Sequence, residues 1–269
     1  MNNVFGEKSL FEDIFPSTEK YNGKSNTASP PPDITAVDTA ARLIHQTLEL
    51  AGIFIYPGIR TIDLAESLEK SLKGRGADSG VLLSISPEDT VWHGIPGERK
   101  LKSGEIVTVD IACSVRGWWA DAARTFPVGV IDEKRKELIC AARMATTKLA
   151  TIMKPGQIGI ESAESVLKVT GRWNISLISE GAGHGIGRKM HEPPSLTYDG
   201  RTHEPLRSGY LYTAEPVLSS GSGKILIAGD GSAVTADGEP SAHFEVTLLL
   251  IEHGTQILGS PDWIKHQPC

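Results

Sequence analysis

The chain has 269 residues and a formal net charge of −6, with 39% hydrophobic and 22% charged residues. This composition is ordinary for a globular protein, and the length corresponds to one large domain or two small ones. A chain of this size buries enough surface to fold without disulfides. The negative charge disfavours a broad phosphate-binding surface, so we expect no nucleic-acid partner.

Targeting signals and cysteine spacing both favour the cytoplasm. The sequence contains no apolar run of about 18 residues and no signal-peptide core, so we expect neither a membrane-bound nor a secreted protein. The three cysteines are scattered and form no CxxC pair, and Cys113 and Cys140 lie in apolar runs typical of buried thiols. We therefore expect no disulfide framework and no structural zinc site, as in a reducing cytoplasm.

The first 33 residues differ in composition from the rest. The stretch STEKYNGKSNTASPPPD is polar, rich in Pro, Ser and Asn, and has no hydrophobic period. Such a segment cannot bury enough apolar surface to become ordered by itself. We expect a mobile N-terminal extension over residues 1–33, a folded domain over 34–258 and a short C-terminal tail over 259–269.

The remaining chain contains an internal repeat. The segments DTAARLIHQTLELAG and TIDLAESLEKSLK, separated by a Pro-Gly break, are matched further on by KELICAARMATTKLATIM and GIESAESVLKVTG. All four carry apolar residues at helical spacing, and each pair precedes β-branched, strand-like segments. We expect two pseudo-equivalent α+β halves, joined near residue 132, that share one central site.

The segment GEIVTVDIACSVRGWWADAARTFPV is predicted to form a β-hairpin, because its apolar residues alternate with small or polar ones. With a turn at 114–117, Asp110 and Asp121 lie opposite each other across the two strands. Two facing carboxylates repel each other unless one is protonated or a cation is bound between them. The alternative is that Asp121 points to solvent near the rim of the sheet.

Two glutamates occupy strand-like segments of the second half. Glu215, in LYTAEPVL, precedes a proline and taken alone is a candidate for a solvated acid at a strand end. Glu245 lies among apolar residues in SAHFEVTLLLIE, and a lone buried carboxylate is costly without a metal, a cation or a proton. His243 shares the strand face of Glu245, and both pocket lining and an ordinary structural role are open for it.

The stretch GAGHGIGRKMHEPP surrounds His184 with glycines and places His191 seven residues further on. It meets neither nucleotide-binding spacing, and it contains no HExxH. The glycines would let the backbone that carries His184 pass close to a site. His184 and the four acids form an oxygen-rich donor set that suits Mn, Fe or Co better than structural zinc, and four acids can bridge two metals. The four acids are Asp110, Asp121, Glu215 and Glu245.

From about Ile34 to about Leu258, the chain resembles the type 1 methionine aminopeptidases of the pita-bread metallopeptidase superfamily. The resemblance rests on motifs in a fixed order: Trp92-His93-Gly94-Ile95-Pro96, Val109-Asp110, Ala120-Asp121, Gly183-His184-Gly185-Ile186-Gly187 with His191-Glu192, Glu215-Pro216 and Phe244-Glu245. It implies an α+β pita-bread fold in which two pseudo-symmetric halves surround a curved antiparallel sheet, with 34–258 as the catalytic domain.

The resemblance also implies a role for each of the five metal-binding residues. Asp110 would chelate one divalent ion. Asp121 and Glu245 would bridge two ions, and His184 and Glu215 would hold the second. The candidate ions are Co, Mn, Fe and Zn, and the sequence does not distinguish them.

The implied reaction is hydrolytic removal of the N-terminal methionine from peptides and nascent proteins by a water that two metal ions activate. His191 would contact the scissile carbonyl and stabilise the tetrahedral intermediate, and His93 would approach the scissile amide. Glu215 would also move a proton. Trp92, next to His93, is expected to contact the substrate.

Several pocket positions depart from the family pattern. Trp92 replaces a small residue before His93, and Gly181 stands where Met or an aromatic residue is usual. Ser232 stands where a tryptophan is common, and Val246 replaces a histidine. Two interpretations of Trp92 are open: it substitutes for the tryptophan absent at Ser232, which would conserve pocket volume, or it reshapes the pocket for another first residue.

Two other functions are compatible with the pattern. One is a related pita-bread aminopeptidase of altered specificity, such as a Xaa-Pro or peptide-tailoring enzyme. The other is a catalytically silent pita-bread module that binds partners, although such a module has no need for clustered acids. The expected partners are peptide or nascent polypeptide N-termini, with the ribosome as a further candidate, and we expect a monomer without a membrane partner.

Overall fold

A computed structural model describes residues 31–265 of the chain, except residues 79 and 182. The chain divides into two units, Met1–Pro31 and Pro32–Cys269, and every described helix and strand belongs to the second. The predicted extension over 1–33 therefore lies almost entirely outside the described residues. None of the described helices has the length and apolar character needed to span a membrane.

The helices form two pairs, as the internal repeat predicts. They are α2 (Ile34–Phe54) with α3 (Thr61–Gly74), α4 (Glu133–Ile152) with α5 (Ile160–Thr170), and a short α6 (Asp262–Lys265). The long helices begin alike: the Asp33 carboxylate accepts the Ala36 N–H at 3.0 Å, and the Asp132 carboxylate accepts the Arg135 N–H at 2.9 Å. Such caps satisfy amide groups that have no partner inside the helix.

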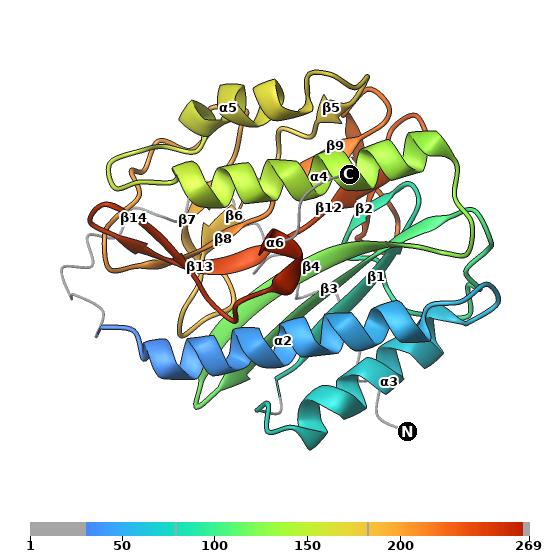
Figure 1. The fold of residues 1–269 in the computed structure, drawn as a ribbon, viewed down its shortest axis with the longest axis horizontal. Coiled ribbons are helices and arrows are strands. Elements are labelled where there is room, and N and C mark those ends of the chain that lie inside the picture. The colour runs from blue at the N-terminus through green and yellow to red at the C-terminus, as the bar shows by residue number, and fades with distance from the viewer. Residues whose placement is uncertain (1–30, 79, 182, 266–269) are drawn as a thin grey trace. The chain divides into compact units, whose positions relative to one another are not determined.

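The strands of the described residues pair antiparallel throughout. In Figure 1, α2 and α4 both lie in front of them. In chain order they are β1 (Leu82–Pro87), β2 (Thr90–Trp92), β3 (Ile106–Val115), β4 (Trp118–Pro127), β5 (Ser176–Leu177), β6 (Gly183–Gly185), β7 (Glu192–Leu196), β8 (Leu211–Ala214), β9 (Val217–Ser219), β10 (Ile225–Ile227), β11 (Ala233–Thr235), β12 (Ser241–His243), β13 (Val246–Ile251) and β14 (Gly254–Ile257). Their sheet orders are β1-β3-β4, β10-β11-β2, β12-β9-β5 and β14-β13-β8-β6-β7.

The predicted hairpin is present as β3 and β4, but its register differs from the prediction. Asp110 pairs with Ala123, and Asp121 pairs with Ala112, so the two aspartates do not face each other directly. The reason is the two-residue loop Arg116–Gly117, in which both residues have positive φ, as a tight hairpin turn of this kind requires. The aspartates still share a sheet face as diagonal neighbours.

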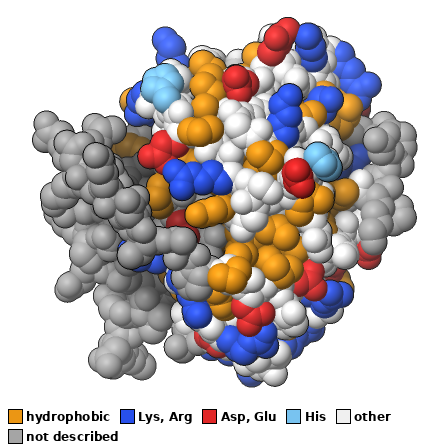
Figure 2. Space-filling model, turned by 90° about the vertical axis from the view of Figure 1, so that its left-hand side faces the viewer, with side chains coloured by type: hydrophobic (Ala, Val, Ile, Leu, Met, Phe, Trp, Pro, Cys, Tyr) orange, Lys and Arg blue, Asp and Glu red, His pale blue; other side chains and the backbone are white. Residues whose placement is uncertain are grey.

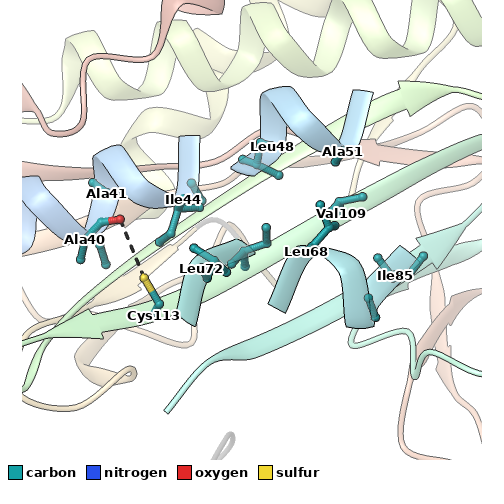
Figure 3. Packing of buried hydrophobic residues seen from close by; sticks show 14 of the residues in the cluster. Ala40, Ala41, Ile44, Leu48, Ala51, Leu68, Leu72, Ile85, Val109 and Cys113 are labelled. Carbon is teal, nitrogen blue, oxygen red and sulfur yellow. Dashed lines mark hydrogen bonds between the residues drawn. The ribbon is translucent and has the colours of Figure 1, made fainter. Parts of the chain in front are cut away.

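Two hydrophobic clusters form the core, chiefly one in each half. In the first, Ala40 and Ile44 of α2 lie near Cys113 of β3 and Leu72 of α3, and Ala51 of α2 and Leu68 of α3 lie near Val109 of β3, as Figure 3 shows. Because side chains alternate along a strand, Asp110 points away from these helices. The second cluster joins α4 and α5 to the strands of the second half.

The cysteines agree only in part with expectation. Cys113 is free and buried, as predicted, and its Sγ lies 3.8 Å from the carbonyl oxygen of Ala40. Cys140 is disulfide-bonded, so the prediction of a free thiol there is wrong. Spacing along a sequence does not reveal which thiols meet in the fold. The cysteines therefore give no support for a reducing compartment.

The segment around Glu245 connects the two halves. Glu245 does not lie inside one continuous strand, as the sequence suggests, but between β12 and β13. Its N–H donates to the carbonyl of Ala123 on β4 at 2.9 Å. Beyond residue 258, the predicted tail includes Trp263, which is buried against Phe244 with ring centroids 5.0 Å apart. The boundary at 258 stays a prediction.

Candidate metal centre

The structure brings the five predicted metal-binding residues together where the two halves meet. One donor atom each of Asp121, His184 and Glu245 lie within 4.8 Å of one another. His184 Nε2 is 3.9 Å from Asp121 Oδ2 and 3.5 Å from Glu215 Oε1. Asp110 joins Glu245 in a second group of the same kind. The role of each residue stays a prediction.

Unsatisfied oxygen atoms show that the cluster fits a cation. The side chains of Asp121 and Glu245 are buried, with 6% and 1% of their residue surfaces exposed. Within the described part of the chain, Asp121 Oδ1 and Glu245 Oε1 have no hydrogen-bond partner. Buried carboxylate oxygens without a donor are costly, and a divalent cation would supply the missing interaction.

The carboxyl pKa values lead to the same conclusion. Burial raises the pKa of Asp110 to about 6, and burial together with the nearby Asp110 carboxylate raises the pKa of Glu215 to about 8. Burial, followed by repulsion from neighbouring carboxylates, raises the pKa of both Asp121 and Glu245 well above the ordinary range. Without positive charge the four groups cannot all be ionised near neutral pH.

The His184 ring is oriented so that Nε2 can act as a ligand. Its Nδ1 lies 2.9 Å from the carbonyl oxygen of Gly185, which can only accept a hydrogen bond. The ring proton therefore sits on Nδ1, and the lone pair of Nε2 points toward Asp121 and Glu215. Burial lowers the pKa of His184 to about 4, which keeps the ring neutral.

Two threonines that the sequence did not single out form hydrogen bonds with three of these residues. The Thr213 hydroxyl accepts a hydrogen bond from the backbone N–H of His184 at 2.9 Å and donates one to Glu215 Oε1 at 2.9 Å. The Thr247 hydroxyl accepts the Asp121 N–H and donates to the Asp121 carbonyl, both at 2.8 Å. Each threonine lies two residues from a predicted ligand, and strand alternation is the only sequence signal for it.

The glycines around His184 allow close packing of the backbone. A Cβ at Gly183, where φ is +146°, would lie 2.4 Å from the carbonyl oxygen of Thr213. A Cβ at Gly185 would lie 2.7 Å from the carbonyl oxygen of Glu192. The backbone that carries His184 thus lies directly against β8 and β7, and no other residue type fits there.

The two predicted substrate-binding histidines lie beside the cluster. The rings of His184 and His191 have centroids 4.3 Å apart. Burial lowers the pKa of His191 to about 3, and burial followed by repulsion from His191 lowers that of His93 to about 4. His93 has a φ of 57°, a left-handed conformation that is strained for a residue with a side chain and is common at functional sites.

Trp92 lies at the edge of a small third cluster. Its ring packs on a buried group that includes Ile178 and Val217, and β2 pairs Trp92 with Ala233, next to Ser232. A Cβ at Gly181 would lie 3.4 Å from Cζ3 of Trp92. The indole therefore occupies the space beside Gly181, one of the positions where the sequence departs from the family pattern.

An antiparallel α+β fold with buried carboxylates and imidazoles between two halves defines a class of metal-dependent hydrolases. The sequence model of metallopeptidase family M24 matches residues 35–252. The chain belongs to metallopeptidase family M24.

Individual relatives agree with this membership. Methionine aminopeptidase from Clostridium perfringens is 33% identical over 84% of this chain and 95% of its own length. Methionine aminopeptidase 1 from Bacillus subtilis is 30% identical over 85% and 96% of the two chains. The crystal structure of methionine aminopeptidase from Thermotoga maritima matches with a TM-score of 0.78 and 30% identity, over 87% of this chain and 98% of that one.

The pita-bread fold predicted from the sequence is thereby confirmed. The Xaa-Pro dipeptidase from Bacillus anthracis has the same fold, with a TM-score of 0.69. It is 22% identical and covers 88% of this chain and 61% of that one, so its likeness concerns the fold alone.

Proposed function

We propose that this metallopeptidase removes the N-terminal methionine from peptides and nascent polypeptides. The observation that carries the proposal is the buried cluster of four carboxylates and His184 between the two halves. Its support is the similarity of nearly the whole chain to proteins named methionine aminopeptidase. A binding module without catalysis would have no reason to retain buried carboxylates that lack hydrogen-bond donors.

The cluster is proposed to hold two divalent ions, with Co, Mn, Fe and Zn as candidates. When bound, such ions polarise a scissile carbonyl and make water a nucleophile near neutral pH. The proposed ligands are Asp110, Asp121, His184, Glu215 and Glu245.

The residues beside the cluster would complete the reaction. His191, which stays neutral because its pKa is low, would donate a ring N–H to the oxygen of the scissile carbonyl as negative charge develops there. His93 would contact the scissile amide from the loop after β2. Glu215 would carry a proton from the attacking water to the leaving amine.

An aminopeptidase of altered specificity is the second candidate. The observation that favours it is the indole of Trp92 beside Gly181, a position where the resemblance implies a larger residue. If the indole only replaces lost pocket volume, methionine remains the preferred first residue. If it narrows the pocket, another first residue is preferred and the hydrolytic chemistry is unchanged.

The setting of the reaction is also proposed. Residues 34–258 would form the catalytic domain, which would act as a monomer in the cytoplasm on nascent chains at the ribosome or on free peptides. On the face seen in Figure 2, Lys and Arg side chains lie among acidic and apolar ones.

The test is release of the N-terminal residue from Met-Ala-Ser, Leu-Ala-Ser and Ala-Pro-Ala. The full chain is treated with a chelator and then given Mn, Co, Fe or Zn in turn. We expect metal-restored cleavage of Met-Ala-Ser. Cleavage of another peptide in its place would support the second candidate, and a folded protein that cleaves none with any metal would contradict both.

A further inference from the structure

His243 lies inside the metal cluster, although the family pattern assigns it no role. One of its ring nitrogens, one oxygen of Asp110 and one oxygen of Glu245 lie within 4.8 Å of one another. Ligands that share one ion are roughly 3–4 Å apart, because each bond is about 2.0–2.2 Å long. Small side-chain movements would therefore bring the three atoms onto a common ion.

The His243 side chain is buried, and its position is fixed by its backbone. Its exposed fraction is 2%, and Nδ1 has no hydrogen-bond partner among the residues that the structure describes. The His243 N–H donates to the Thr125 hydroxyl at 3.1 Å, and that hydroxyl donates to the His243 carbonyl at 2.9 Å. The strand pair β12–β9 adds a second anchor.

An unsatisfied buried histidine is not in itself a ligand. The ring nitrogens of His45 on α2 also lack partners within the described ranges, and no cluster of acids surrounds His45. What distinguishes His243 is the pair of carboxylates beside its ring nitrogen. One of them, Glu245, also belongs to the group of Asp121 and His184.

We propose that His243 is a sixth metal ligand, which binds through a ring nitrogen on the Asp110 side of the cluster. This inference rests on the metal-dependent function proposed above. Each ion would then have one imidazole, from His184 on one side and from His243 on the other, with Glu245 between them. Imidazole favours Zn, Fe and Ni over Mn, so His243 would shift the metal preference of its side toward Zn.

The experiment measures metal binding rather than activity. Metal-free full-length protein is titrated with Zn²⁺ and, separately, with Mn²⁺ by calorimetry. The variants are His243→Gln and the control His93→Gln, which removes a nearby imidazole that is not a proposed ligand. Circular dichroism checks that each variant is folded. In parallel, ¹⁵N NMR of the histidine rings in wild-type protein with two equivalents of Zn²⁺ identifies the rings that bind metal, so one readout needs no variant.

We expect two zinc-bound imidazoles in the wild type and one in His243→Gln. We also expect the affinity of one Zn²⁺ site to fall at least about tenfold in His243→Gln, with a smaller loss for Mn²⁺ and none in His93→Gln. A wild-type protein with two bound Zn²⁺ but one zinc-bound imidazole, or unchanged Zn²⁺ affinity in folded His243→Gln, would overturn this inference and leave the proposed function standing. Failure of the wild type to bind either metal would overturn both.

Discussion

The indole of Trp92 lies against the backbone of Gly181, so that a Cβ added at 181 would be in van der Waals contact with Cζ3 of the ring, at 3.4 Å. We expect a large residue at 181 and a tryptophan at 92 to compete for the same volume, so that the effects of substitutions at the two positions are coupled.

Gly181→Phe is expected to lower kcat/KM for Met-Ala-Ser by about tenfold or more, because the phenyl ring must displace Trp92. Adding Trp92→Ala should recover most of the loss, since side chains in contact give non-additive effects. The measurement is a double-mutant cycle in kcat/KM. Gly229→Phe is the control, because a Cβ at Gly229 meets nothing within 4 Å. Additive losses would contradict the shared-volume argument.

Glu245→Ala is expected to abolish metal-dependent activity, with a loss of at least about a hundredfold, because it removes the carboxylate that both donor groups share. Metal binding should raise the Tm of the wild type and have much less effect on the variant. Metal analysis and thermal unfolding with and without chelator measure both effects. The exposed Glu252 gives the control variant, Glu252→Ala. Full activity of Glu245→Ala in a defined metal buffer would show that Glu245 is not a ligand.

Thr213→Val is expected to lower metal affinity by about 10- to 100-fold. The change leaves Glu215 Oε1 without its hydroxyl donor and the backbone N–H of His184 without its acceptor. Thr213→Ser keeps the hydroxyl and should behave like the wild type. Calorimetric titration with Zn²⁺ distinguishes the two variants. Equal affinities in both would mean that Thr213 contributes packing alone.

His45 is expected to make folding stability depend on acid pH independently of metal. Burial lowers the pKa of its imidazole from the ordinary 6.5 to about 4. Below pH 6.5 the unfolded chain takes up a proton that the folded protein does not, so the free energy of unfolding falls as pH decreases from 6.5 to 4. The full difference is about 3 kcal/mol.

Urea unfolding of metal-free protein at several pH values tests this prediction. His45→Gln should show a shallower decline of stability toward acid than the wild type. The exposed His203 provides the control, His203→Gln, which should follow the wild type. Parallel curves for wild type and His45→Gln would contradict a neutral, buried imidazole at 45.

The sequence was sufficient to predict the four main helices and the first hairpin, because their hydrophobic periods are long and regular. It could not predict the register between Asp110 and Asp121. That register depends on a left-handed backbone conformation at Arg116, and an arginine does not predict this conformation. The sequence also did not predict the break before β13, because the continuous apolar run around Glu245 is typical of a single strand.

The sequence predicted those members of the candidate site whose side-chain chemistry is specific for metal binding. It did not predict those whose role depends on which residues the fold brings together. Buried acids and a glycine-flanked histidine indicated a metal site. The role of Thr213 depends on a hydroxyl that lies between His184 and Glu215, a relation that spacing alone does not contain. His243 was left open for the same reason, because its ring nitrogen becomes a candidate ligand only when Asp110 is brought beside it.

The donor set is divided between the halves: Asp110 and Asp121 precede α4, whereas His184, Glu215 and Glu245 follow it. The link before α4 is accessible, and Val130 within it is 88% exposed. A chain cut at this link would yield two fragments, each with most of one hydrophobic cluster and neither with a complete cation site. Recovered peptidase activity would then report that the fragments have reassociated.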